Sequence, residues 1–162
     1  YITNFGKAHL EGFGGVEGVI QGKSELYEYL TSNNKYVFLN ADDPIQMQKL
    51  DSYVKKIGFS TTNHQYFNIT YVEANPFVVL EVEGTSIKTQ LIGKYNFTNC
   101  CAAIIMGKYF GVPLEEIKTA LEAKNVPSGY GTFGLLHDGK LVSDHYISAT
   151  RFRNILKKAS VG

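Results

Sequence analysis

The chain has 162 residues, with 16 Lys and Arg against 15 Asp and Glu, four His and two Cys. This length suits one domain or part of a larger one, and a hydrophobic share of 44% indicates a folded core rather than a disordered tail. A net charge of +1 gives no electrostatic reason to expect nucleic acid as a partner. No apolar stretch reaches the roughly 20 residues that span a bilayer, so we expect no membrane span.

The two cysteines, Cys100 and Cys101, are neighbours in the sequence. Adjacent side chains of a helix point about 100° apart, so these thiols do not bridge each other easily. We therefore expect small, buried, reduced thiols. The His and Cys residues form no zinc-ligand spacing, and the first residues show no signal-peptide pattern. These features predict a cytoplasmic protein.

In the first part of the chain, helical patterns alternate with short apolar runs. The glycine-rich segment 1–14 predicts the end of a strand followed by a loop. Apolar residues at helical spacing predict a helix over 16–30, and the run 36–39 predicts a buried strand. An Asp N-cap and a Pro at the first position then predict a helix over 44–56. Residues 57–60 predict another short strand.

The pattern changes after residue 60. Strand-like segments, separated by turn residues, occupy 66–73, 76–83, 86–92 and, more weakly, 130–136 and 140–144. Helical patterns return over 97–110 and 114–124, and a basic helix-like tail starts near residue 148. We therefore predict an α/β fold, with a mainly parallel sheet flanked by helices and a small antiparallel β-meander.

The stretch from Gly18 to Ser24 looks at first like a phosphate-binding P-loop. A P-loop places four residues between its glycines, so that backbone N–H groups can surround a phosphate. Here three residues separate Gly18 from Gly22, and Glu17 stands where the motif needs a glycine. Because the stretch also lies inside a helical pattern, we expect no P-loop there.

Lys23 falls on the apolar stripe of the same predicted helix, between Val19 and Tyr27. Burial costs the charged form of a lysine more than the neutral form. One interpretation is an amine kept partly neutral for covalent or metal chemistry. The other is a lysine whose stem lies on the edge of the core while its charge stays in water.

Five segments then form a recognisable series: Thr3–Gly14, Gly22–Leu26, Leu39–Asp43, Gly93–Ala103 and Gly111–Leu121. In this order they resemble the central ATPase domain of the Mur ligase family. The most specific part is the His-Leu-Glu-Gly-Phe-Gly stretch that begins at His9, with Lys23 at its spacing. Within the family, the motifs resemble most the branch that joins D-alanyl-D-alanine to the UDP-muramoyl tripeptide.

The resemblance implies an ATP-dependent amide ligase of peptidoglycan precursor synthesis. ATP would phosphorylate a substrate carboxylate, and an amine would then displace the phosphate, with ATP and Mg²⁺ as cofactors. The substrates would be a UDP-muramoyl peptide and an amino acid or dipeptide. The resemblance further implies that His9 is a magnesium ligand, and that Lys23 is a catalytic residue whose carbamate holds a second magnesium. It also implies nucleotide contacts at Asn40, Asn96, Asn99 and Asp144.

Simpler roles stay open for several of these polar residues. Asn96 precedes a predicted helix and suits its N-cap, and this role is compatible with an adenine contact. Asn99 also suits packing or a bond to the backbone. His9 suits ordinary hydrogen bonding in a loop, and Asp42 and Asp43 suit capping.

Residues 126–162 depart from the family pattern. The Arg that the family expects is missing from 128–134. In the later Asp-x-Tyr motif, Asp144 and Tyr146 match, but the Asn and Pro that should follow do not. The basic residues after position 150 suit a solvated helix face.

We therefore expect residues 1–162 to form one partial central domain, well matched over 1–125. The family's P-loop and substrate-binding domain would precede it, and a third domain would follow it. The isolated piece would then lack a complete phosphate cradle and turnover. Two alternatives stay open: a divergent non-catalytic module with a binding or scaffold role, and a ligase similar to folylpolyglutamate synthase.

Overall fold

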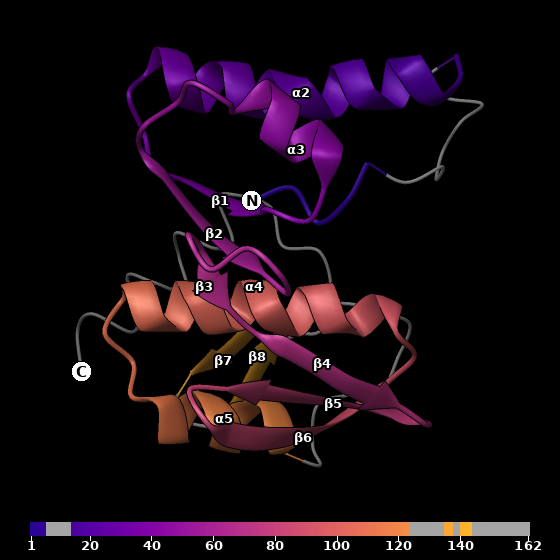
Figure 1. Cartoon of the computed structure of the whole chain (residues 1–162), viewed down its shortest axis with the longest axis vertical. Coiled ribbons are helices and arrows are strands. Elements are labelled where there is room, and N and C mark those ends of the chain that lie inside the picture. The colour runs from indigo at the N-terminus through magenta and orange to yellow at the C-terminus, as the bar shows by residue number, and fades with distance from the viewer. Residues whose placement is uncertain (6–13, 124–134, 138–139, 144–162) are drawn as a thin grey trace. The chain divides into compact units, whose positions relative to one another are not determined.

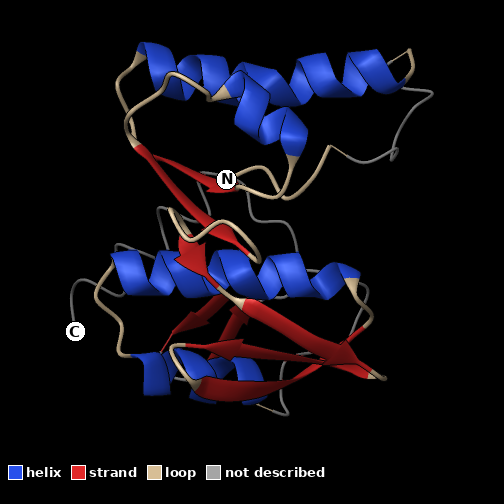
Figure 2. Cartoon of the chain, in the orientation of Figure 1, coloured by secondary structure: helices blue, strands red, loops and turns tan. Residues whose placement is uncertain are grey.

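The computed structural model describes residues 1–5, 14–123, 135–137 and 140–143. The chain divides into two compact units, Tyr1–Ala123 and Lys124–Gly162. The helices are α2 (Val16–Ser32), α3 (Pro44–Lys49), α4 (Tyr95–Tyr109) and α5 (Leu114–Glu122). The strands are β1 (Val37–Asn40), β2 (Lys56–Ser60), β3 (Phe67–Asn68), β4 (Thr70–Ala74), β5 (Phe77–Val82), β6 (Thr85–Ile92), β7 (Leu135–His137) and β8 (Lys140–Ser143). Helices, a parallel sheet and an antiparallel sheet together confirm the predicted α/β class (Figures 1 and 2).

Strands β1, β2 and β3 form a parallel sheet in that order. Val37 and Leu39 of β1 belong to one core cluster, together with buried residues of α2 and of segment 1–5, whereas Phe38 packs against the other cluster. Successive residues of a strand point to opposite faces, so α2 and α3 cover one face of the sheet and α4 covers the other (Figure 1). Both faces are thereby buried, as the apolar run 36–39 predicts.

The helix predicted over 44–56 is too long, because α3 ends at Lys49. In the turn that follows this end, the Lys56 Nζ atom donates to the carbonyl oxygens of Leu50 at 2.8 Å and Asp51 at 2.7 Å. These bonds satisfy two carbonyl oxygens of the turn before the chain continues as β2. The strand end predicted in segment 1–14 is also wrong where the structure describes it, since residues 1–5 form no strand.

Strands β4, β5 and β6 form the predicted antiparallel meander. Glu83 and Gly84 join β5 to β6 with positive φ angles of 50° and 74°. Two positive φ angles in a two-residue loop give the turn whose twist matches a β-hairpin, and glycine adopts such an angle without steric cost. Alternate residues of β5 point into the core beneath α4, where Val78 and Leu80 are fully buried.

Within the second unit, β7 and β8 pair in antiparallel fashion, so a strand lies where the described residues overlap each of the two weaker predicted segments. Residues 130–134 of the first segment lie outside the described residues. In the first unit, Cys100 and Cys101 are buried in α4 and form no disulfide, as expected. Burial raises the pKa of the Cys100 thiol to about 12, so it stays protonated at neutral pH. None of the helices that the structure describes has the length and apolar character needed to cross a bilayer.

Candidate functional site

Lys23 lies where the sequence predicts it, on the half-buried edge of α2. Val19 and Tyr27, one turn before and one turn after it, are only 1% and 3% exposed. Residues 18–24 all lie inside α2, which confirms that they form no P-loop. The helix therefore directs the lysine stem along the core and leaves its amine at the edge.

The Lys23 amine meets two oxygen atoms of Asn4, which lies in the segment before α2. Nζ donates to the Asn4 carbonyl oxygen at 2.7 Å and contacts the Asn4 side-chain oxygen at 3.5 Å. A cation thus already lies among hard oxygen atoms, the ligand type that magnesium prefers. Magnesium binding beside Lys23 stays a prediction, because the two oxygen atoms that the structure shows here belong to one residue.

Gln46 forms a buried junction that the sequence analysis did not identify. Its side chain is 0% exposed. Its oxygen accepts from the Tyr27 hydroxyl at 3.0 Å and from the Asn40 backbone N–H at 3.0 Å. Its nitrogen donates to the Ile2 carbonyl oxygen at 3.1 Å and to Asp43 Oδ2 at 3.1 Å. All the hydrogen-bonding positions of the amide are filled, as burial of a polar group requires.

A sequence signal for Gln46 does exist. Asp43 is the N-cap of α3 and accepts from the backbone N–H groups of Ile45 at 2.9 Å and Gln46 at 3.3 Å. A Gln three residues after an N-cap is the spacing of a capping box. Here the amide reaches beyond the cap to other elements, and periodicity alone does not indicate such a reach.

Asn40 and Asp42 shape the carboxyl edge of the parallel sheet. The side-chain oxygen of Asn40 accepts from the Asp42 N–H at 3.0 Å. The Asp42 carboxylate binds Thr61 through its N–H at 2.8 Å and its hydroxyl at 2.7 Å, and it also accepts from the Ser60 hydroxyl. Asp42 thus joins the ends of β1 and β2 rather than capping a helix. In α/β sheets, ligands bind outside the carboxyl ends of the strands, which is where these groups lie.

Tyr1 adds a further polar group on this side of the sheet. Its hydroxyl oxygen is buried and has no hydrogen-bond partner among the described residues. Burial raises the pKa of the phenol, and the neighbouring Cys101 and Asp43 add to the effect.

Asn96 is not the N-cap of α4, because the cap position is Lys94. Asn96 lies inside the first turn, and its nitrogen donates to the Ile92 carbonyl oxygen at 2.9 Å. Its oxygen accepts from the Asn99 side-chain nitrogen at 3.1 Å. The two asparagines therefore form a local pair. In the part of the chain that the structure describes, no hydrogen bond joins this pair to Lys23 or Asn40.

Two predicted residues, His9 and Asp144, lie outside the described residues. Within the described ranges, no three His, Cys, Asp or Glu residues gather as a metal-binding group. The predicted magnesium ligands and the role of Asp144 therefore stay predictions.

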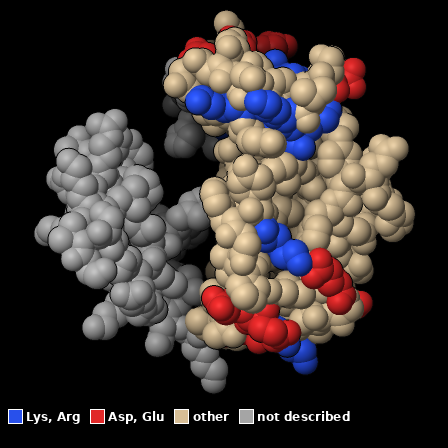
Figure 3. All heavy atoms as spheres, turned by 90° about the vertical axis from the view of Figure 1, so that its left-hand side faces the viewer, with Lys and Arg blue, Asp and Glu red and all other residues tan. Residues whose placement is uncertain are grey.

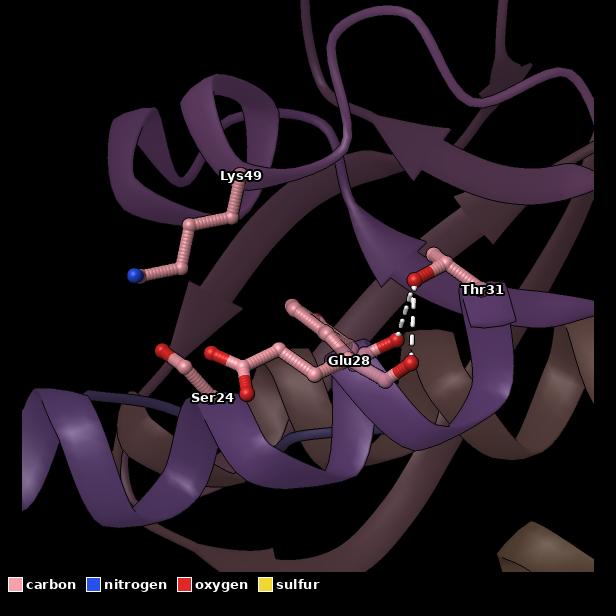
Figure 4. Close-up of a pocket in the computed structure, with 5 residues that line it drawn as sticks. Ser24, Glu28, Thr31 and Lys49 are labelled. Atoms are coloured by element: carbon pink, nitrogen blue, oxygen red, sulfur yellow. Dashed lines mark hydrogen bonds between the residues drawn. The ribbon is translucent and has the colours of Figure 1, made fainter. Parts of the chain in front are cut away.

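A small pocket of about 150 Å³ lies between α2 and α3 (Figure 4). It is lined by Ser24, Tyr27, Glu28, Thr31 and Lys49. Figure 4 shows Lys49 reaching from α3 toward Ser24 and Glu28, while Thr31 donates back to the Tyr27 and Glu28 carbonyls. Pockets for nucleotide-sized ligands measure roughly 300–1,000 Å³, so this one is too small to hold ATP.

The surface charges are mixed on the face drawn in Figure 3. Basic side chains form a band near the top of that face, and acidic side chains lie both above it and toward the opposite end. Lys108 and Glu83 form an ion pair at 2.7 Å. The described residues of this face therefore carry both signs of charge, in line with a net charge of +1.

Sequence comparison decides the family. A sequence model described as the Mur ligase middle domain matches residues 1–107, which is most of the chain. The chain belongs to the Mur ligase middle domain family. A second model, described as YoaP-like, matches residues 113–154.

Several curated proteins resemble this Mur ligase domain. The UDP-N-acetylmuramoyl-tripeptide–D-alanyl-D-alanine ligase of Haemophilus influenzae is 32% identical over 140 residues, covering 79% of this chain and 29% of that protein. The Bacillus subtilis ligase of the same name is 28% identical, covering 77% of this chain and 27% of that protein. The chain thus spans less than a third of the length of these two relatives.

Solved structures support the Mur ligase fold. A crystal structure of MurF from Acinetobacter baumannii matches with a TM-score of 0.62 at 20% identity, covering 99% of this chain and 36% of that one. A pseudomurein peptide ligase type C from Methanothermus fervidus matches with a TM-score of 0.57 at 19% identity, covering 78% of this chain and 34% of that one. At these identities the likeness concerns the fold.

Proposed function

We propose that this chain is part of the central domain of a cytoplasmic, ATP-dependent amide ligase of peptidoglycan precursor synthesis. The observation that carries the proposal is the match to the Mur ligase middle domain over residues 1–107, with Lys23 half-buried and directed at the oxygen atoms of Asn4. The reaction would join an amine to a UDP-muramoyl peptide carboxylate after activation by ATP. Regions outside residues 1–162 would bind most of these substrates.

In this proposal Lys23 acts as a carbamate. Its neutral amine adds to the carbon of carbon dioxide, one C=O electron pair moves to oxygen, and the nitrogen loses a proton. The side chain changes from a cation to an anion with two carboxylate oxygens. That group and His9 would hold magnesium ions, which supply positive charge against the phosphates and the acyl phosphate.

Asn4 has a defined part in this arrangement. The ammonium form of Lys23 has three N–H donors, whereas the carbamate nitrogen retains one. The Asn4 carbonyl oxygen, 2.7 Å from Nζ, accepts that remaining N–H. This bond would fix the rotation of the carbamate and present its oxygen atoms away from Asn4. A flexible lysine is thereby held in one orientation for metal binding.

The Asn96–Asn99 pair would contact the nucleotide, with Asn40 and Asp144 as further contacts. Asn96 uses both ends of its amide within the described structure, through its bonds to Ile92 and Asn99. We therefore assign the direct contact to Asn99 and a holding role to Asn96. At Asn40, the side-chain nitrogen would serve, because its oxygen already accepts from Asp42.

The test replaces Lys23 with Ala in the whole protein and measures ATP-dependent ligation of a UDP-muramoyl peptide. We expect kcat to fall by about 100-fold or more, with partial recovery on adding a short-chain acid that replaces the carbamate. Lys49→Ala, which removes an exposed lysine of α3, is the control and should keep full activity. Full activity of the Lys23→Ala protein would exclude the carbamate role. If the unmutated protein forms no amide bond with any substrate, the non-catalytic alternative applies.

A further inference from the structure

Four parts of the first unit meet at one side chain, the buried amide of Gln46. Its oxygen binds Tyr27 of α2 and the end of β1 at Asn40. Its nitrogen binds the α3 cap at Asp43 and the segment before α2 at Ile2. The amide oxygen thus binds α2 and β1, and the amide nitrogen binds the α3 cap and segment 1–5.

The bond to Ile2 leads directly to Lys23. Ile2 is two residues before Asn4, and Asn4 supplies the oxygen atoms that meet the lysine amine. Residues 1–5 form no strand in the described structure, so no sheet ladder fixes their position. The buried side chains of Ile2 and Phe5 attach the segment to the core, but apolar burial has no direction. The hydrogen bond from Gln46 is directional and sets where the backbone lies.

We propose that Gln46 is the positioning residue for Lys23. Its hydrogen bond to the Ile2 carbonyl fixes the backbone of segment 1–5. The Asn4 carbonyl oxygen is thereby kept within hydrogen-bond distance of the Lys23 amine. The consequence for catalysis rests on the proposed function. The positioning itself is a property of the folded chain and can be measured without substrates.

Two variants separate the two sides of the amide. Gln46→Glu keeps an acceptor for Tyr27 and Asn40 but removes the donor to Ile2 and adds repulsion to Asp43. Tyr27→Phe removes one bond on the other side of the same amide and leaves the bond to Ile2 intact. Both variants lower stability, so a purely structural role would affect Lys23 in both.

The readout is the rate at which acetic anhydride labels Lys23, followed by mass spectrometry of the full chain in carbon-dioxide-free buffer. Lys49, exposed on α3, provides the internal reference. We expect Gln46→Glu to raise the relative labelling rate of Lys23 by about threefold or more, because losing the Asn4 acceptor frees the amine. Tyr27→Phe should change it by less than about 1.5-fold.

Equal acceleration in the two variants, or no acceleration in Gln46→Glu, would overturn the proposal. If the Gln46→Glu chain does not fold, Gln46→Asn is measured against the same standard, because its shorter amide withdraws from Ile2 without adding charge. The labelling needs neither ATP nor a carbamate. Failure of the ligase proposal would therefore leave this result unchanged, and failure of this inference would leave the ligase assay unchanged.

Discussion

Gln46 with its hydrogen-bond partners, here called the Gln46 cluster, differs from the Asn96–Asn99 pair in how far apart in the sequence its members lie. Gln46 joins residues that are 19 and 44 positions away in the sequence, at Tyr27 and Ile2. The asparagine pair uses partners only three and four positions away. The first arrangement forms only when α2, β1, α3 and segment 1–5 have packed together. The second needs only the first turns of α4 and the end of β6. We therefore expect damage to the first to spread to Lys23, and damage to the second to stay local.

The largest expected effect is on the long-range cluster. Gln46→Leu keeps the volume but leaves the Tyr27 hydroxyl, the Asn40 N–H and the Ile2 carbonyl without partners. We expect the free energy of unfolding to fall by about 3 kcal/mol, because these polar groups would stay buried without hydrogen-bond partners. Urea denaturation followed by circular dichroism measures it. If the free energy of unfolding fell by less than about 1 kcal/mol, water molecules would be replacing the hydrogen bonds of the amide, which would contradict the burial of the Gln46 cluster.

A second expectation concerns α4, the helix that starts with the asparagine pair. Burial raises the pKa of the Cys100 thiol from its ordinary value of 9.0 to about 12. Above pH 9 the unfolded chain loses this proton while the folded chain keeps it, so stability falls as the pH rises toward 12. The slope is at most about 1.4 kcal/mol per pH unit for this thiol.

Urea denaturation at pH 9 and pH 11 tests the effect, with Cys100→Ala as the comparison. The variant should start less stable but lose less stability between the two pH values. Equal losses in the two proteins would show that the Cys100 thiol is not as buried as described.

The smallest expected effect is on the local pair. Asn99→Ala removes one bond between two side chains near a helix start, so the free energy of unfolding should fall by about 0.5–1 kcal/mol. Under the proposed function, ATP affinity should fall about tenfold, the equivalent of one lost contact. Calorimetry on the whole protein measures this, with Thr98→Ala as the neighbouring control. Unchanged ATP affinity would remove Asn99 from the nucleotide site.

The sequence predicted the features that depend on local pattern. Periodicity placed Lys23 on the edge of α2, and turn chemistry predicted the link between β5 and β6 at Glu83 and Gly84. Local reasoning was wrong where a distant group decides. Lys56 binds the turn that follows α3, and Gln46 binds segment 1–5 at Ile2, and the local pattern indicates neither contact. The N-cap of α4 was wrong by two residues, because Asn96 bonds backward to Ile92 instead of capping the helix.

The same division applies to the site residues. Family resemblance indicated Lys23, Asn40, Asn96 and Asn99, and the structure places Lys23 in the middle of α2, Asn40 at the end of β1 and the asparagine pair in the first turns of α4. It did not indicate Gln46, because a buried glutamine acquires its role from partners far away in the chain. The roles of all these residues in catalysis stay predictions until they are measured.

The central claim is that Lys23 carries a carbamate. The most direct measurement is a carbon-13 NMR spectrum of the protein in ¹³C-bicarbonate at mildly alkaline pH, compared with that of the Lys23→Arg variant. The account predicts a carbamate signal in the unmutated protein that is absent from the variant. A signal of equal size in both proteins, or none in either, would contradict it.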